Sequence, residues 1–410
     1  MLQTKTGYSG HAGASANIWT PQPAAAAIER AHAAWGELTA LRSVPDVAWL
    51  RLSVEALEPN AFYDPVWAKA VAAHADGRTD PQVLLAWDGR GRNRLIGLLP
   101  VVSSWRAFRL PLPLMVAWHA YAPLATPLLD RADPSRAWSA LLDAAEDAGA
   151  RALLLPSMSA DGPAAHALGS ALTRRNLSAI AIAGIERASL DATRDADTLL
   201  REALGAKKLK ELRRQRHRLA DSGPVAFESA TSPADTARTL ETFLALEAMG
   251  WKARQGTALL QHAGDAAFIR QAVPALAAQG RCEIVSLARG GVPVACGIVL
   301  RHGSRAFFFK ITFDEQERKN SPGVQLTLDL TRHLCADPAI ADVDSTADAD
   351  HPMIDHVWRG RLAMADLFVP LRADDLRIAA IRTILIARHA ARNRARRIVR
   401  AIRSVRERYR

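Results

Sequence analysis

The feature that most constrains the fold is an order of predicted elements that occurs twice along the 410-residue chain. In the first half, Gln82–Trp87 and residues 95–104 are apolar runs that flank Asp-Gly-Arg-Gly, a strong hairpin signal. A helix at 135–148 and a short strand at 152–155 follow. In the second half, hairpin strands at 282–288, 294–301 and 306–312 precede a helix and a strand at 341–344. This order predicts two mixed α/β domains, although no sequence repeat of fixed period is present.

Four regions follow from this pattern. Residues 1–40 mix Gly, Ser, Thr, Pro and Ala, which predicts a poorly ordered leader whose later part begins a helix. Residues 41–194 form the first domain and residues 195–370 the second. Residues 371–410 are expected to form an arginine-rich, amphipathic tail helix.

The net charge of +11 is concentrated in that tail. Residues 371–410 contain thirteen arginines against Asp374, Asp375 and Glu407, so the preceding 370 residues are close to neutral. Cysteines at 282, 296 and 335 form no C-x-x-C pair, which argues against a disulfide framework or a zinc site and favours a reducing cytoplasm. We recognise no secretion signal or membrane span, and we expect no metal.

The segment at 306–334 predicts an anion-binding loop. A strand ends in a polar connection, and Ser321-Pro322-Gly323 then opens an amphipathic helix. Serine caps free amides, proline is tolerated at the first helical position, and glycine permits close approach of a ligand. Such a helix N-terminus favours a phosphate, and the alternative is an ordinary capped helix.

Several motifs together resemble a known family. In the second half they are Gly250-Trp251-Lys252, Phe308-Phe309-Lys310 with Asp314-Glu315, Ser321-Pro322-Gly323, and Asp350-His351-Pro352-Met353 with Trp358 and Arg361. In the first half they are Asn60-Ala61-Phe62, Gly97-Leu98-Leu99-Pro100 and Thr126-Pro127-Leu128. Over residues 55–370 the chain resembles the acetyltransferases of the CelD/BcsL type, which are associated with cellulose biosynthesis, belong to the GNAT superfamily and are related to the FemAB aminoacyl transferases.

The resemblance implies an α/β (α+β) fold of two tandem GNAT-like domains, each a mixed, mostly antiparallel sheet flanked by helices, plus a C-terminal basic helix. It implies acyl transfer from acetyl-CoA to an amine or hydroxyl on a cell-envelope or exopolysaccharide-linked acceptor. The donor site is then expected at Lys310, Asn320, Ser321, Gly323, Val324 and Gln325. This sequence departs from the usual R/Q-x-x-G-x-G/A pattern, since only Gly323 is present. The FemAB relatives use aminoacyl-tRNA as donor.

Acyl transfer needs a base, a donor to the developing oxyanion and a proton for the leaving thiolate. Asp344 follows a short apolar run and is expected at the carboxyl end of a strand, where ligands bind in α/β sheets. His351 can act as a base at neutral pH. Glu247 stands shortly before Trp251 and Lys252. The alternatives are a helix-capping aspartate for Asp344 and a structural loop histidine for His351.

Acceptor-binding candidates are Trp251 and Lys252, as a turn that lays an indole over the substrate, and Asp314 in the polar connection. The helix around 201–218 carries eight Lys or Arg against two Glu, and Arg214 and Arg218 lie on one face at i, i+4 spacing. They are expected to contact an anionic substrate. The alternatives are a core tryptophan, a solvated loop and a solvated helix.

In residues 377–410 apolar residues recur every three or four positions, with arginines over the other faces. The pattern favours an amphipathic helix on an anionic membrane surface, at the inner face of the membrane. Nucleic-acid contact and a disordered tail are the alternatives, and no specific nucleic acid is expected as partner, because Tyr409 is the only aromatic residue there.

Two functions remain open. The first is an acyl-CoA-dependent N- or O-acyltransferase. The second is a catalytically inactive binding protein of a polysaccharide synthesis complex on the same fold, and a FemAB-like aminoacyl transferase is a further alternative to the first.

Overall fold

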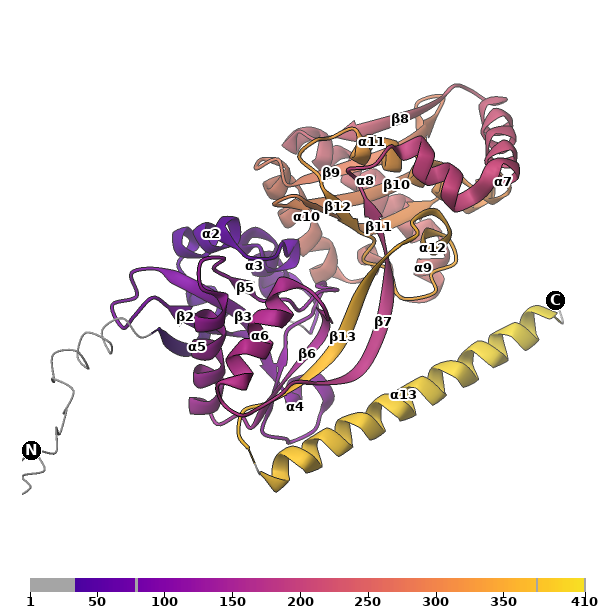
Figure 1. Ribbon diagram of the computed structural model, residues 1–410. Coiled ribbons are helices and arrows are strands. Elements are labelled where there is room, and N and C mark those ends of the chain that lie inside the picture. Colours follow the sequence, from indigo (N-terminus) through magenta and orange to yellow (C-terminus); the bar gives the residue numbers. More distant parts are fainter. Residues whose placement is uncertain (1–33, 78–79, 374, 409–410) are drawn as a thin grey trace, which may run out of the picture. The chain divides into compact units, whose positions relative to one another are not determined.

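One mixed sheet of thirteen strands runs through the part of the chain that the computed structural model describes, which comprises residues 34–77, 80–373 and 375–408 (Figure 1). The strand order is β1-β2-β3-β4-β6-β13-β7-β12-β11-β10-β9-β8, and β5 pairs with β3. All pairs are antiparallel except β4 with β6 and β11 with β12. The predicted fold class, a mixed and mostly antiparallel sheet flanked by helices, is confirmed.

The first half contributes seven strands and five α-helices among the described residues. The strands are β1 Trp35–Ala40, β2 Gln82–Trp87, β3 Leu95–Ser103, β4 Leu114–Ala117, β5 Leu128–Leu129, β6 Ala152–Ser159 and β7 Ile180–Asp191. The helices are α2 Asp46–Glu55, α3 Pro65–His74, α4 Ser104–Phe108, α5 Pro134–Asp147 and α6 Pro163–Thr173.

The second half repeats the hairpin-helix-strand order. Its strands are β8 Val225–Ala230, β9 Cys282–Arg289, β10 Val292–His302, β11 Arg305–Phe313, β12 Asp342–Asp344 and β13 Gly360–Pro370. Its helices are α7 Ala196–Ala220, α8 Pro233–Met249, α9 Trp251–Arg254, α10 Ala263–Ala277, α11 Pro322–Cys335, α12 Ile354–Val357 and α13 Leu376–Arg408, and the 3₁₀-helix η4 spans Glu315–Asn320.

Helix starts follow the capping rules that the sequence suggests. Proline stands at the first helical position of α3, α5 and α8, after Asp64, Asp133 and Ser232. Each of these three side chains accepts a hydrogen bond from a backbone N–H of the first turn, for example Asp64 from the Val66 N–H. The caps explain why α5 and α8 begin within a residue of their predicted starts at 135 and 232, whereas α3 was not predicted.

Two long strands join the halves. Figure 1 shows β7 and β13 side by side, and their register runs from the Gly360–Ser189 pair to the Phe368–Ile180 pair. β13 also pairs with β6 of the first half, while β7 pairs with β12 of the second. The last strand of residues 195–370 therefore inserts between two strands of the first half. The predicted domain boundary at 194 stays a prediction.

The halves also share a core. Phe62 and Trp67 of the first half meet Phe307, Phe309 and Phe268 of the second, and the Phe62–Phe307 and Trp67–Phe309 ring centroids are 5.4 and 4.8 Å apart in edge-to-face geometry. Leu240 and Leu244 of α8 belong to this core. Leu326 and Leu330 of α11 belong to a second core with Leu200 and Leu212 of α7. α8 and α11 thus cover opposite faces of the same strands.

Several local predictions were wrong. The helix expected at the end of the leader is not found over the described residues 34–40, where Trp35–Ala40 forms β1 against β2; the rest of the leader, residues 1–33, lies outside the described residues. The strand expected at 124–129 shrinks to Leu128–Leu129. The helix expected over 196–222 is broken at Gly205, whose φ of 72° and ψ of 163° are not helical.

The tail prediction of a long helix is confirmed as far as the structure describes it, because α13 extends to Arg408. Ile381 and Leu385 anchor its first turns in a small core with Leu154 and Phe368. Over the described residues, no helix combines the length and the apolar character needed to cross a bilayer.

Candidate functional site

A cavity of about 780 Å³ lies where the two parallel strands of the second half part. β11 and β12 pair over three positions, from Arg305–Asp342 to Phe307–Asp344, and β11 then continues to Phe313 paired with β10 but without β12 on its other side. Ligands in α/β proteins bind at the carboxyl ends of such strands. The cavity walls come from the end of α8, the start of α9, β11, the start of α11 and residues 345–347 and 351–354.

A bulge in β11 lies beside this cavity. Ile298 of β10 pairs with Lys310, but the next residue, Val299, pairs with Phe308, so Phe309 is left out of the register. Both Phe308 and Phe309 line the cavity. Bulges of this kind redirect side chains and leave one residue outside the ladder hydrogen bonds, and they are frequent next to active sites.

Glu247, Lys252 and Lys310 form a charged cluster in the cavity wall. The Glu247 Oε1 atom accepts hydrogen bonds from Lys252 Nζ at 3.0 Å and from Lys310 Nζ at 3.2 Å, while its Oε2 accepts from the Leu259 N–H at 2.9 Å. Lys252 also donates to the Ile311 carbonyl at 2.8 Å. The Glu247 side chain is 0% exposed and the lysines are 17% and 18% exposed.

The surroundings of the cluster shift the pKa values of two of its members, Glu247 and Lys252. Burial raises the pKa of the Glu247 carboxyl, but the charges of Lys310 and Lys252 together with hydrogen bonds from Leu259 and Lys252 outweigh burial and hold that pKa below its usual value. Burial, assisted by the charge of Lys310, lowers the pKa of Lys252 despite the Glu247 carboxylate. Glu247 is therefore an ionised carboxylate, and a weak base while both lysines hold it.

The start of α11 forms another part of the wall. Ser321 precedes Pro322 and has left-handed backbone angles, φ 51° and ψ 50°, and its side chain makes no capping hydrogen bond. The prediction that the Ser321 hydroxyl caps the helix was wrong. Ser321 accepts the first helical bond through its carbonyl, from the Gln325 N–H at 3.0 Å.

The amides of Gly323 and Val324 belong to the first turn, so they have no acceptor within the helix. Both residues line the cavity. A Cβ atom on Gly323 would lie 3.2 Å from Phe313 Cδ1 and 3.5 Å from Met353 Sδ. A side chain here would have to displace the Phe313 ring, so glycine keeps this turn open, and these two amides can receive an anion.

His351 lines the cavity, but its ring is already committed at one nitrogen. Its Nδ1 accepts hydrogen bonds from the Met353 and Ile354 N–H groups, both at 3.3 Å, at the start of α12. An Nδ1 acceptor places the ring hydrogen on Nε2. Burial lowers the pKa of His351, which favours this neutral ring. In this state His351 offers an N–H donor and not the basic lone pair that we expected.

Asp344 does not line the cavity. Its side chain is 1% exposed and forms an ion pair with Arg187 of β7, with Arg187 NH1 3.0 Å from Asp344 Oδ2. Asp344 Oδ1 also accepts the Thr346 N–H at 2.7 Å. The carboxylate thus holds the β12 end in place, and its placement contradicts the predicted catalytic base.

Trp251 lies at the cavity rim and is 45% exposed, so the core role considered for it is excluded. Its backbone N–H donates to Glu315, which also binds Arg254 at 2.7 Å. Lys252 Nζ lies 6.0 Å from the Trp251 ring. The indole is thus available beside the charged cluster.

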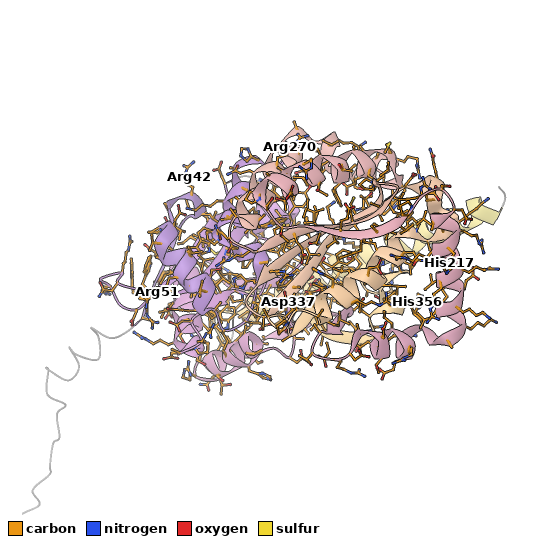
Figure 2. The ribbon with its side chains drawn as sticks, turned by 90° about the horizontal axis from the view of Figure 1, so that it is seen from above. Arg42, Arg51, His217, Arg270, Asp337 and His356 are labelled. Atoms are coloured by element: carbon orange, nitrogen blue, oxygen red, sulfur yellow. The ribbon has the colours of Figure 1, made fainter. Side chains whose placement is uncertain are left out.

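Five predicted residues lie elsewhere. Gln325 donates to the Leu212 carbonyl at 2.7 Å and faces α7, because it lies on the side of α11 away from the cavity. Asn320 binds Glu317, and Asp314 caps η4 by accepting the Gln316 N–H. Arg214 and Arg218 both pair with Glu211 on the exposed side of α7. Figure 2 shows His217, from the same helix, at the outer edge of the molecule.

Sequence reasoning missed three groups of the cavity wall. They are Arg254, Arg318 and Thr346. Arg254 follows the Gly-Trp-Lys motif by two residues and Thr346 follows Asp344 by two, so short distances along the chain were the available signal. Arg318 lies in η4, which appeared only as a polar connection.

The comparisons with known proteins fit this geometry. Residues 206–351 match the family model described as an acetyltransferase (GNAT) domain. This segment contains Glu247, Lys310, Gly323 and His351. No curated protein sequence matches the chain significantly. The prediction of a GNAT-superfamily acyltransferase is confirmed, and such a domain in general takes its acyl group from an acyl-CoA.

Among solved structures, two similar folds span nearly the whole of their own chains. A C-terminal domain assigned to a lysylphosphatidylglycerol synthetase from Agrobacterium fabrum has a TM-score of 0.51 at 15% identity, over 83% of this chain and 96% of that one. FemX has a TM-score of 0.52 at 11% identity, over 81% of this chain and 96% of its own. At these identities the likeness concerns the fold, which extends over both halves.

Proposed function

We propose that this protein transfers an acyl group, acetyl in the simplest case, from acyl-CoA to an amine or hydroxyl of a cell-envelope or exopolysaccharide-linked acceptor, as the resemblance to the CelD/BcsL type implies. The observation that carries the proposal is the cavity at the parted strands, which joins a free helix N-terminus to a buried charged cluster. The GNAT match over the same residues supports the reaction class.

The donor would bind at the start of α11. The amides of Gly323 and Val324 and the exposed Arg318 side chain supply hydrogen bonds and positive charge for a pyrophosphate. Ser321, just before this turn, has the left-handed backbone conformation that favours glycine. We propose that the donor is held here although only Gly323 of the usual glycine pattern is present.

The transfer itself breaks the thioester C–S bond and forms a C–N or C–O bond. The acceptor attacks the carbonyl carbon, the acceptor loses a proton, and the departing thiolate gains one. Glu247 is the fully buried carboxylate of the cavity wall and would take up the acceptor proton as charge develops. The Nε2–H of neutral His351 would donate to the thiolate sulfur or to the oxyanion.

Titration of the protein with acetyl-CoA tests the proposal. We expect heat of binding, a thermal shift and loss of both on Gly323→Asp, which puts a carboxylate at the phosphate position. If acetyl-CoA gives neither heat nor shift, the proposal fails and the inactive binding protein becomes the better account. If aminoacyl-tRNA is bound and acetyl-CoA is not, the aminoacyl-transferase alternative replaces it.

We further propose that α13 binds an anionic membrane surface and holds the enzyme near its acceptor. Ile381 and Leu385 fix the start of the helix. Arg377, Arg382 and Arg392 are exposed along it, and Arg388 stacks 4.1 Å from the Phe108 ring. Beyond that point Ile398, Ile402 and Val405 continue an apolar stripe in the sequence with further arginines beside it.

Each basic residue near such a surface contributes about 1 kcal/mol. Replacement of Arg396, Arg397, Arg400 and Arg403 by Gln in the full chain should therefore abolish cosedimentation with vesicles that contain phosphatidylglycerol. Replacement of Arg174, Arg238, Arg270 and Arg332, which are exposed away from α13, is the matched control. Equal binding by both variants would contradict the tail proposal.

A further inference from the structure

The cavity has two ends on opposite faces of the sheet. The α11 end belongs to the face that packs on α7, since Leu326 and Leu330 lie in that core. The end with Glu247 belongs to the face covered by α8, whose Leu240 and Leu244 lie in the core shared with the first half. A donor held by its phosphates at α11 therefore leaves the α8 end for the other reactant.

The charged side chains of the cavity wall include more cations than anions. Lys252, Arg254, Lys310 and Arg318 face only two carboxylates, Glu247 and Glu315. Arg254 and Glu315 neutralise each other through two hydrogen bonds of 3.0 and 2.7 Å. Glu247 then remains as the single anion for two lysines at the α8 end. A buried cation without its own counter-ion is unfavourable, so this end favours an anionic ligand.

Lys310 is the cation with unused hydrogen-bonding capacity. Its ammonium has three donors, and within the described chain it makes one side-chain hydrogen bond, to Glu247. Lys252 makes two, to Glu247 and to the Ile311 carbonyl. Glu247 offers Lys310 no second acceptor, because its other carboxylate oxygen accepts the Leu259 N–H. Two Lys310 donors thus remain for a ligand, in a side chain only 18% exposed.

We infer that the acceptor carries an acid group, a carboxylate, close to its nucleophile, and that Lys310 binds this group. The inference rests on the proposed function, in which the donor occupies the α11 end. It narrows the acceptor from any amine or hydroxyl to acidic ones, such as amino acids, acidic peptides or uronic-type sugars. Lys310 then acts as a specificity residue for the acceptor and not as a ligand of coenzyme A.

Matched pairs of ligands test this. Calorimetry with the protein saturated with free coenzyme A, which has no acyl group to transfer, compares glycine with glycinamide, β-alanine with β-alaninamide, and glucuronate with glucuronamide. A hydrogen bond to a charged group corresponds to about 10- to 100-fold in affinity. We expect each acid to bind better than its amide by such a factor, Lys310→Met to bring the ratio close to one, and Lys310→Arg to preserve it.

Lys319→Met, on an exposed lysine of the loop before α11, is the control and should leave the ratio unchanged. Three outcomes would each overturn the inference. The first is equal affinity of the wild-type protein for acids and amides, and the second is no binding of any acid at 10 mM, which corresponds to a binding free energy no better than roughly −3 kcal/mol. The third is a preference for acids that survives Lys310→Met. Failure of the proposed function looks different: acetyl-CoA itself does not bind, whether or not the acids do.

Discussion

Glu247→Gln is the substitution that most directly probes the charged cluster. It removes the one carboxylate between Lys252 and Lys310 and keeps the shape of the side chain. Loss of one partner from a buried ion pair costs about 3 to 5 kcal/mol. Because the lysines keep 17% and 18% exposure and Gln retains one acceptor oxygen, we expect the lower end, about 3 kcal/mol of unfolding free energy. For a chain of this size that corresponds to a fall of about 4 °C in Tm.

Urea unfolding followed by circular dichroism at pH 7.5 measures the loss, and a double variant identifies its cause. In Glu247→Gln with Lys310→Met, the unpaired cation disappears together with the anion. We therefore expect the double variant to recover about 1 to 3 kcal/mol relative to the sum of the single variants. Glu241→Gln, on the same helix but in an exposed pair with Arg270, should cost less than about 1 kcal/mol.

The pH dependence supplies an independent check. The folded-state pKa of Glu247 lies below its ordinary value of 4.5, so its contribution is present above that pH and is lost as the pH falls through the folded pKa. The difference in stability between wild type and Glu247→Gln should thus shrink below about pH 4. Two results would refute the ion-pair account. One is strict additivity of the stability losses from Glu247→Gln and Lys310→Met, and the other is a stability difference between wild type and Glu247→Gln that stays constant down to pH 3, roughly 1.5 units below the ordinary pKa of a glutamate.

Three further predictions follow from single contacts. Gly323→Val should weaken acetyl-CoA binding by at least about 10-fold in calorimetry, because a Cβ at this position already has a neighbour at 3.2 Å and a larger side chain would disturb the turn. Gly169→Val, on the exposed side of α6, is the control and should leave the affinity unchanged. Asp344→Asn should cost about 3 kcal/mol of unfolding free energy by leaving Arg187 without its carboxylate partner, yet keep the shape of the pH–rate profile; loss of the acidic limb of that profile would restore Asp344 as the base. Burial lowers the pKa of His302 from 6.5 to about 4, so the unfolded chain takes up a proton on this histidine at a higher pH than the folded protein does. As the pH falls from 6.5 to about 4, the free energy of unfolding measured with urea should therefore decrease by about 3 kcal/mol. His302→Gln should not show this decrease.

The sequence predicted the fold well wherever local signals were strong. The Asp-Gly-Arg-Gly turn, the capped prolines and the glycine turns of the second half fixed β2, β3, β9, β10 and most helices to within a few residues. The partnership of β13 with both β6 and β7 depends on contacts about 180 or more residues apart, which no local pattern records. The four-residue strand β4, which lies between β3 and β6, and the edge strand β8 were too short or too polar to give a strand signal.

The candidate site was predictable as a set of segments but not as a set of roles. The Gly-Trp-Lys, Phe-Phe-Lys, Ser-Pro-Gly and His-Pro-Met motifs do meet at one cavity. A helix places neighbours in sequence on different faces, however, so Gln325 faces α7 while Gly323 and Val324 reach the cavity. The role of His351 changed for a similar reason, since its two backbone donors could not be foreseen from its neighbours.

The first half of the chain contributes to the site without lining it. Arg187 of β7 donates to the Pro123 carbonyl at 2.7 Å and pairs with Asp344 at the end of β12. Asp344 in turn holds the Thr346 N–H, and the Thr346 hydroxyl donates to the Phe308 carbonyl at 2.8 Å beside the β11 bulge. This series of buried hydrogen bonds runs from a loop of the first half to the cavity wall. The residues that line the cavity all lie between Glu247 and Ile354, but the position of their β12 segment depends on residues well before them. The first half therefore fixes the residues that follow β12 beside β11, and with them one wall of the cavity.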